Sequence, residues 1–411
     1  MLEQLLAAMA TRPLVLLCGI SGSGKTQLAR RLGEFRAAGH LGGDTAKGQL
    51  QQLENLNLIE SATVEACKIY KLKVPPPEGS TSLTAVQSDW IEASNLWGYR
   101  NRLEKDAKFE GTPALRSFLD AWQSWIGNGE RCNHVVILDE MNLSRPEHYA
   151  ADLLSAMELM PEERSGPESI AARTERATKT IRLHNEDGSR PLAGGGKFDV
   201  PNAIAWPPGL VVIGTVNIDE TTHAFAPKVL DRAAVLEFTK IPLDGFCVRR
   251  KIGEKVNFSD LPETVQGWVK QVQAATEPAS LHLGYRAITE VVDALSFRLD
   301  ANTAKWETTT GDCLKDALDD LLCDKVLPRV RGARGQVEDV LLALWDISRR
   351  TQEGLRIAKT EDLPKALEQE HRALRAGKEP ETADSGKQSR AQRKIIQMLK
   401  RLHAVGFTSY F

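Results

Sequence analysis

The feature that most constrains this 411-residue chain is a glycine-rich octapeptide near its start. Residues 19–26 read GISGSGKT, which matches the pattern GxxxxGK[ST] at every fixed position. An apolar run from Leu14 to Cys18 precedes it, and a helix-like stretch from Lys25 to Phe35 follows it. In such a strand–loop–helix unit the glycines let the backbone wrap a phosphate group, and the helix N-terminus adds positive potential. The segment therefore predicts a phosphate-binding loop in an α/β domain, in preference to a glycine-rich turn that binds nothing.

The chemistry expected of this loop is nucleotide binding with Mg²⁺. Lys25 would bridge the β- and γ-phosphates, and Thr26 would hold Mg²⁺. The expected nucleotide-binding residues are Gly19, Ser21, Gly22, Ser23, Gly24, Lys25, Thr26 and Gln27.

Composition narrows the class of protein. A hydrophobic fraction of 42% and a charged fraction of 26% are ordinary for a soluble globular chain. A net charge of −2 gives no global footprint for nucleic acid, so any DNA contact would be local. The six cysteines lack metal-ligand spacing, and no apolar run approaches the roughly 20 residues of a membrane span. We expect a cytoplasmic protein with reduced thiols and no membrane association.

Apolar runs and turn signals predict the organisation of the chain. Parallel strands are expected at 14–18, 81–86, 135–138, 210–216 and 234–238, with helices at 25–35, 113–126 and 146–157. Residues 1–243 would form the α/β core, with insertions at about 36–80 (weakly helical over 50–70), 98–111 and 160–205. The last two read as hairpins that could touch a substrate or partner, or as ordinary loops. A helical domain would follow over 244–360, then a linker and a basic amphipathic helix over 361–411.

Two carboxylates, Asp139 and Glu140, follow the predicted strand at 135–138. Ligands of open α/β sheets lie at the carboxyl ends of strands, so this pair is placed beside the phosphate loop. Asp139 would complete the Mg²⁺ shell, and Glu140 would orient and polarise the attacking water. Asn142 could help to hold that water, although a turn-forming asparagine fits nearly as well. A simple helix cap is the alternative for the acidic pair.

A phosphate loop, an Asp-Glu strand and a strand that ends in a polar residue occur in the order typical of AAA+ ATPases. The chain resembles the McrB-related branch of that family, near the MoxR and dynein-like groups. The segments that carry the resemblance are ILDEMNLSRPEHYAADLLSAMEL, GTVNIDETTHAFAPKVLDRA, LWGYRN and HLGYRAITEVV, with MLKRLHAVGFTSYF at the end. The implied fold is an AAA+ P-loop NTPase core, a parallel sheet flanked by helices, followed by a helical lid domain.

The resemblance also implies roles for three residues outside the loop. Asn217 would be the sensor between the metal strand and the γ-phosphate. Arg232 would act in trans on the nucleotide of a neighbouring subunit; a local pair with Asp231 or Asp219 is the alternative. Arg286 would be the lid arginine that reads the nucleotide, or else a surface arginine of a helix.

The function implied is a ring, usually a hexamer, that couples hydrolysis to movement along or remodelling of a substrate. By resemblance this would be DNA in a McrBC-like restriction or phage-defence system, with a separate McrC-like nuclease subunit. Here Asp219 stands one residue nearer to Asn217 than in McrB, so ATP and GTP both stay open. Only 18 residues precede Gly19, so target recognition is expected in a partner or in a part absent from this chain.

Two other functions share most of these residues. A MoxR-like ATPase would remodel protein clients and would need the same catalytic groups. A nucleotide-gated scaffold would bind without turnover, but Glu140 and Asn217 argue against it, because a pure binder needs no carboxylate that positions water.

Overall fold

The computed structural model divides into two compact units, Met1–Thr239 and Lys240–Phe411. It describes residues 2–37, 59–64, 67–72, 80–101, 103, 108–128, 133–159, 180–185, 188–193, 199–218, 223–243, 246–251, 254–299, 312–352, 363–380 and 388–411. Within these ranges no helix has both the length and the apolar character needed to cross a bilayer.

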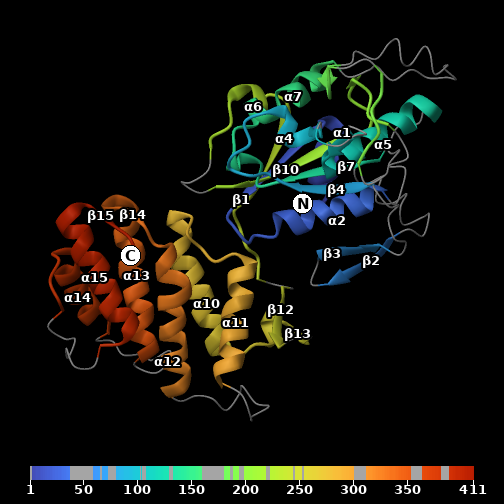
Figure 1. The fold of residues 1–411 in the computed structure, drawn as a ribbon. Helices are drawn as coiled ribbons and strands as arrows, with labels where there is room; N and C mark the ends of the chain where they lie inside the picture. Colours follow the sequence, from blue (N-terminus) through green and yellow to red (C-terminus); the bar gives the residue numbers. More distant parts are fainter. Residues whose placement is uncertain are drawn as a thin grey trace. The chain divides into compact units, whose positions relative to one another are not determined.

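The first unit is built on a five-stranded sheet (Figure 1). Its strands lie in the order β11-β1-β10-β7-β4, and every neighbouring pair is parallel. Their bounds are β1 (Leu14–Gly19), β4 (Thr81–Ala85), β7 (Val135–Asp139), β10 (Val211–Asn217) and β11 (Ala233–Phe238). All five carboxyl ends therefore lie at one edge of the sheet, the edge at which open α/β sheets bind ligands.

Both faces of this sheet are buried, because alternate residues of each strand enter different cores. On one face Val15, Ile137 and Ile213 pack with residues of α1 (Leu2–Thr11) and α2 (Lys25–Ala37). On the other face the neighbours of these residues pack with α5 (Pro113–Asn128) and α7 (Ala151–Glu158). The central strands β1, β7 and β10 are buried on both sides and read as unbroken apolar runs, which is why the sequence predicts them well.

The predicted helix at 146–157 is divided in the structure. It forms α6 (Pro146–Tyr149) and α7, and Ala150 between them departs from helical geometry with φ −115° and ψ 21°. The other short helices among the described residues of this unit are α4 (Ala93–Trp97), η1 (Met141–Leu143) and α9 (Pro227–Leu230).

Antiparallel hairpins accompany the main sheet. The pairs are β2 (Ile59–Val64) with β3 (Cys67–Leu72), β5 (Gly98–Arg100) with β6 (Phe109–Gly111), and β8 (Ile181–Arg182) with β9 (Ala203–Ile204). The helical pattern expected over 50–70 is wrong where the structure describes that segment. Its β-branched residues, such as Ile59, Val64 and Ile69, favour strands and overrode a weak helical period.

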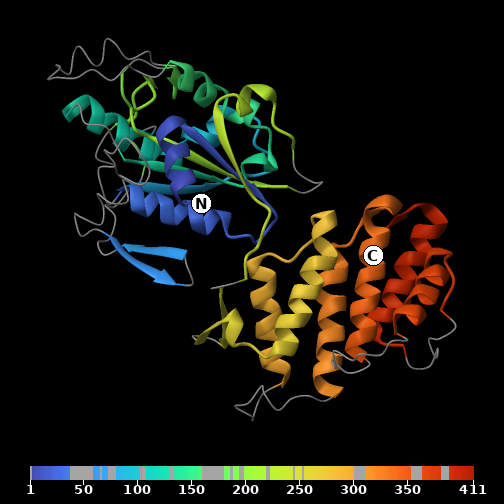
Figure 2. The ribbon, with the colours of Figure 1, turned by 180° about the vertical axis from the view of Figure 1, so that it is seen from behind.

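The second unit begins with a hairpin and continues as packed helices (Figures 1 and 2). The hairpin is β12 (Cys247–Lys251) with β13 (Glu254–Asn257), so the expectation of helix alone from residue 244 is wrong at this point. The helices and minor elements are η2 (Phe258–Asp260), α10 (Glu263–Thr276), η3 (Glu277–Ala279), α11 (Tyr285–Leu299), α12 (Asp312–Leu321), η5 (Leu322–Val326), η6 (Leu327–Arg329), β14 (Gly332–Ala333), α13 (Arg334–Gln352), α14 (Leu363–Arg375), α15 (Arg390–Val405) and β15 (Phe407–Thr408). The basic C-terminal helix α15 buries Ile395 and Leu399 in the core of this unit.

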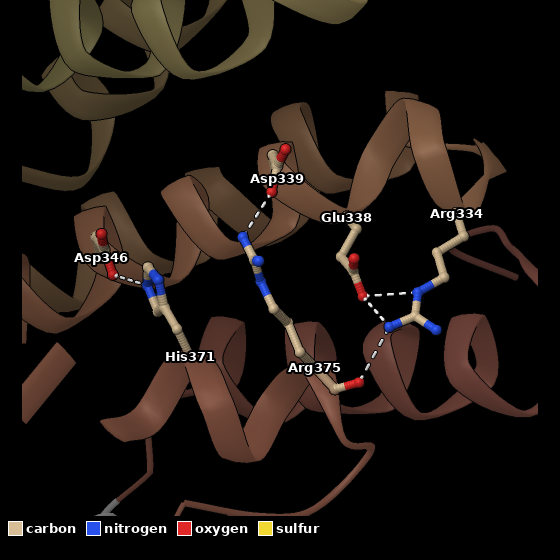
Figure 3. A network of polar contacts seen from close by, with 6 residues as sticks. All are labelled: Arg334, Glu338, Asp339, Asp346, His371 and Arg375. Carbon is tan, nitrogen blue, oxygen red and sulfur yellow. Dashed lines mark hydrogen bonds and ion pairs between the residues drawn. The ribbon is translucent and has the colours of Figure 1, made fainter. Parts of the chain in front are cut away.

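Polar contacts in the second unit join helices α13 and α14 (Figure 3). Arg375 pairs with Asp339 at 2.9 Å, and His371 lies 2.7 Å from Asp346. A further carboxylate, Glu370, is 1% exposed and accepts a hydrogen bond from the Trp345 Nε1–H at 2.7 Å. Arg349 neutralises the same carboxylate at 3.2 Å.

The predicted fold class is confirmed by this architecture: a parallel sheet flanked by helices, with a phosphate-loop sequence after β1, and a mainly helical second unit. The units divide between Thr239 and Lys240. The predicted core ended at residue 243, and the predicted C-terminal segment 361–411 falls within the second unit.

Candidate functional site

The predicted phosphate loop joins the end of β1 to the start of α2 (Figure 1). Gly22 and Gly24 have φ angles of 77° and 89°, a backbone region that residues with a side chain rarely adopt. At Gly19 a Cβ atom would lie only 2.4 Å from the carbonyl oxygen of Phe238 on β11. These glycines are therefore required by the shape of the loop, and that shape ends at a helix N-terminus suited to anions.

Lys25 is folded into the loop and is 5% exposed. Its Nζ donates to the carbonyl oxygens of Gly19 and Ile20 at 2.9 and 2.7 Å, and to Ser23 Oγ at 3.4 Å. The loop thus surrounds a cation, which is the charge that the phosphates of a nucleotide require. Of the other predicted loop residues, Ser21 and Gln27 are exposed and Thr26 is half-buried.

The thiol of Cys18 lies directly before the loop and is 9% exposed. Burial raises its pKa from 9.0 to about 11, with Glu237 adding to the rise and Lys25 opposing it. The thiol is therefore protonated at neutral pH, and Cys18 is a packing residue of the strand rather than a nucleophile.

Asp139 ends β7 beside the phosphate loop. The Thr26 hydroxyl donates to Asp139 Oδ1 at 2.6 Å, although 113 residues separate them in the chain. A hydroxyl and a carboxylate are the hard oxygen ligands that Mg²⁺ takes together with waters and substrate phosphates. The described residues contain no group of three or more His, Cys, Asp or Glu placed to hold a metal. Thr26 and Asp139 therefore fit Mg²⁺ bound with a nucleotide better than a cation held by protein ligands alone.

Glu140 follows in a left-handed conformation, with φ 54° and ψ 47°. Its side chain is exposed, and its Oε1 accepts a hydrogen bond from Asn217 Nδ2 at 3.1 Å. The predicted sensor and the predicted water-polarising carboxylate thus lie in direct contact across the ends of β10 and β7. An exposed carboxylate held in this way can reach a water beside a bound nucleotide.

Asn142 lies in the turn after β7 and is 3% exposed. Its Nδ2 donates to the Asn217 carbonyl oxygen at 2.9 Å, and its Oδ1 accepts from the Asn217 N–H at 3.3 Å. Both ends of this amide bind main-chain atoms, so its contacts fix the position of Asn217.

Thr215 was not assigned a role from the sequence, yet it lies at the centre of this arrangement. Its hydroxyl donates to Asp139 Oδ1 at 2.7 Å and accepts from the Glu140 N–H at 2.9 Å. The one signal in the sequence is a hydroxyl residue inside an otherwise apolar strand. Buried polar groups require partners, so such a residue points to a contact across the sheet.

Arg232 lies between α9 and β11, and in the single chain it meets a charge of its own chain. Its Nη2 pairs with the carboxylate of Glu158 at the end of α7, and its Nη1 donates to the Lys228 carbonyl oxygen. Of the two local partners considered from the sequence, Asp219 lies outside the described residues, and the ion pair that the described residues show is with Glu158 and not with Asp231.

Arg286, the predicted lid arginine, is the second residue of α11 in the second unit. In that unit the neighbouring Tyr285 hydroxyl donates to the Pro242 carbonyl oxygen at 3.0 Å. The nucleotide-reading role of Arg286 stays a prediction.

Comparison with known proteins gives limited matches. A family model described as "Domain of unknown function (DUF8727)" matches residues 247–407, which lie in the second unit. No curated protein matches the chain. The chain is similar to two crystal structures of NtrX from Brucella abortus, one of them in complex with ADP, each at 14% identity.

The extent of that similarity is small. The match covers 89% and 90% of this chain but 64% and 66% of the NtrX chains, so the chain spans less than two thirds of their length. The TM-scores are 0.33 and 0.32. Values this low do not establish a shared fold, and the fold and the site therefore rest on the strand order and contacts described above.

Proposed function

We propose that this chain is a nucleoside triphosphatase of the AAA+ type. The observation that carries the proposal is the meeting of the phosphate loop with the acidic end of β7, through the 2.6 Å hydrogen bond from Thr26 to Asp139. Two segments far apart in the chain are thereby joined at the edge where open α/β sheets bind ligands. ATP or GTP would be the substrate.

Each residue has a task that follows from its chemistry. The loop and Lys25 bind the phosphates, and Thr26 and Asp139 hold Mg²⁺, which when bound neutralises charge on the phosphates. Glu140 accepts a proton from water and orients it for in-line attack. Asn217 donates a hydrogen bond to the Glu140 carboxylate at 3.1 Å, so a nucleotide bound beside Asn217 would also affect the position of that carboxylate.

The finer proposal is a ring-forming motor in which Arg232 acts on the nucleotide of the next subunit. Its present partner Glu158 is 57% exposed, and its own side chain is 23% exposed. Glu158 is the more exposed partner, and solvent screening weakens such a pair, so exchanging Glu158 for a phosphate should cost little. Developing charge on the transferred phosphoryl group is the charge that such an arginine stabilises.

The substrate of the motor is proposed from resemblance of the motif segments. A McrBC-like restriction or defence system, with DNA as substrate and a separate nuclease subunit, is the first choice. A MoxR-like role in remodelling protein clients uses the same catalytic residues. Stimulation of hydrolysis by DNA with a nuclease partner, or by a protein client, separates the two.

The deciding experiment is steady-state phosphate release from ATP and GTP with Mg²⁺, over a range of protein concentrations. Hydrolysis is expected with either nucleotide, and Lys25→Ala should lower it about 10²–10³-fold because one phosphate ligand is lost. Specific activity that rises with concentration, and falls in Arg232→Ala, supports the shared site. Nucleotide binding and assembly without any hydrolysis would replace this proposal with a scaffold.

A further inference from the structure

We propose that Thr215 is a positioning residue that sets both carboxylates of the site, Asp139 and Glu140, through one hydroxyl group. The inference rests on the proposed triphosphatase function for its catalytic meaning. Its structural part stands on contacts within the first unit alone.

The hydroxyl of Thr215 both donates and accepts a hydrogen bond. Thr215 is 2% exposed on β10, and it donates its only proton to Asp139 Oδ1 at 2.7 Å. The same oxygen accepts the Glu140 N–H at 2.9 Å, across 75 residues of sequence. A threonine hydroxyl has one proton and two lone pairs, so no other side chain of the same shape makes both contacts.

Glu140 needs such a contact because its backbone is left-handed, with φ 54°. Residues with a Cβ adopt this region only where their surroundings enforce it. On one side the Glu140 carbonyl oxygen accepts from the Leu143 N–H at 2.8 Å, and on the other Thr215 receives its N–H. Thr215 therefore holds the main chain of Glu140, while Asn217 holds the carboxylate.

The two β10 residues act together because they are two apart in a strand. Residues i and i+2 point to the same face of a sheet, so Thr215 and Asn217 lie on one face, where they contact Asp139 and Glu140 at the end of β7. One end of the strand thus fixes both the backbone and the side chain of Glu140. A shift of β10 relative to β7 would move the backbone and the carboxylate of Glu140 together.

Asp139 is fixed from two directions. Its Oδ1 accepts the Thr26 hydroxyl from the phosphate loop and the Thr215 hydroxyl from the sheet. The Thr26 hydroxyl is also the group expected to hold Mg²⁺, whereas Thr215 has no such duty. Thr215 therefore orients the Asp139 carboxylate before any metal binds. Removal of a residue that hydrogen-bonds a metal ligand typically lowers metal affinity or activity about 10–100-fold.

Thr84 offers a matched control in the same sheet. It lies on β4, which pairs with β7, and it is 7% exposed. Among the described residues its hydroxyl has no hydrogen-bond partner. Thr84→Val and Thr215→Val thus make the same chemical change at two buried strand positions, and only the second removes contacts to the site.

The first readout needs neither nucleotide nor metal. Hydrogen exchange at the Glu140 amide should be about tenfold or more faster in Thr215→Val, since its acceptor is gone. Thr215→Ser keeps the hydroxyl and should exchange like the wild type, as should Thr84→Val. Unchanged exchange at Glu140 in Thr215→Val, or equal acceleration in Thr84→Val, would overturn the proposal.

The second readout is the Mg²⁺ requirement of hydrolysis. Thr215→Val should raise the half-maximal Mg²⁺ concentration and lower kcat, each about 10–100-fold. Binding of a fluorescent ATP analogue without Mg²⁺ should stay unchanged, because the phosphate loop is intact. A folded Thr215→Val with wild-type kcat and Mg²⁺ requirement contradicts the inference. If that variant does not fold, Thr215→Cys replaces it: a thiol is a weaker donor, and wild-type behaviour there contradicts the inference equally.

The two proposals fail separately. A wild-type protein that hydrolyses no nucleotide removes the triphosphatase, while exchange at Glu140 still decides the role of Thr215. Hydrolysis in the wild type with no effect of Thr215→Val removes the positioning role alone.

Discussion

The carboxyl edge of the sheet and the α13–α14 pair use polar groups in different ways. At the sheet edge contacts share atoms: Asp139 Oδ1 accepts from both Thr26 and Thr215. Along α13 and α14 the ion pairs use different side chains, as Arg375 with Asp339 and His371 with Asp346 illustrate, and Arg334 adds a hydrogen bond to the main-chain oxygen of Arg375 (Figure 3). Substitutions at contacts that share an atom have strongly coupled effects on free energy, whereas the effects of substitutions at separate surface pairs add. The first arrangement suits the placing of reactive groups, and the second suits the joining of two helices.

The largest expected effect is on catalysis in the first unit. Glu140→Gln should lower kcat about 10²–10⁴-fold, since the amide cannot accept a proton from water. Because the side chain is exposed, the urea midpoint of unfolding should not change. The control is Glu338→Gln on α13, which loses its 2.8 Å pair with Arg334 but should leave phosphate release unchanged. A Glu140→Gln protein that keeps more than about a tenth of the rate would show that another group activates water.

The next effect is on stability and belongs to the second unit. Glu370 is 1% exposed, so Glu370→Ala strips a buried Trp345 N–H and Arg349 of their acceptor. Removing one partner of a buried pair costs about 3–5 kcal/mol, and the low end is expected because Arg349 is 21% exposed. Urea unfolding measures the loss in the free energy of unfolding, and hydrogen exchange in α13 shows whether the loss lies in this helix. Glu370→Gln should lose less, since its amide oxygen still accepts from Trp345; equal losses would place the effect in packing.

Two buried thiols, one in each unit, allow the opening of the two units to be compared. Cys18 lies in the first and Cys323 in the second, and burial is the main cause that raises their pKa values to about 11 and about 12. Both side chains are buried, so a labelling reagent reaches them only when the structure opens. With the other four cysteines replaced by serine, nucleotide at ten times its Kd should slow labelling of Cys18 about tenfold. Cys323 should be unaffected, and equal protection of both thiols would show that the units open together.

The smallest effect is expected at the surface pair of α13 and α14. Arg375 is 53% exposed and Asp339 is 88% exposed, so Arg375→Gln should cost about 0.2–1 kcal/mol in the free energy of unfolding. Combined with Glu338→Gln, the two losses should add within about 0.5 kcal/mol, because the link between the two ion pairs is a hydrogen bond from Arg334 to the main-chain oxygen of Arg375, which Arg375→Gln keeps. Thermal unfolding of the single and double variants tests this. Strong coupling would mean that the pairs act as one network after all.

Much of the first unit could be predicted from the sequence because its central strands are buried on both faces. Unbroken apolar runs such as Val135 to Leu138 leave few alternatives, and the phosphate loop anchors their order. Asp139 and Glu140 were found because they end such a run next to that loop. The hairpin β2–β3 could not be predicted because a weak helical period over the segment competes with the strand preference of its β-branched residues.

The contacts that hold the site could not be predicted in this way. Thr215 meets Glu140 across 75 residues, and the Glu158 partner of Arg232 lies on a separate helix. Such contacts depend on strand order and on the local path of the backbone, and the left-handed turn at Glu140 has no marker such as glycine. The sequence indicates which residues form the site, but the hydrogen bonds and ion pairs between them could be seen only in the folded structure.

Strand β11 is also the place where mechanical tension would enter the first unit. Phe238 ends this strand beside Gly19, and the second unit begins at Lys240. A pull on the connecting chain would act along β11 and be opposed by its ladder with β1, from Leu14 and Ala233 to Gly19 and Phe238. The phosphate loop starts beside the strand end that leads into the second unit, so under the proposed function any force generated at the loop and any force applied to the second unit would share this one strand.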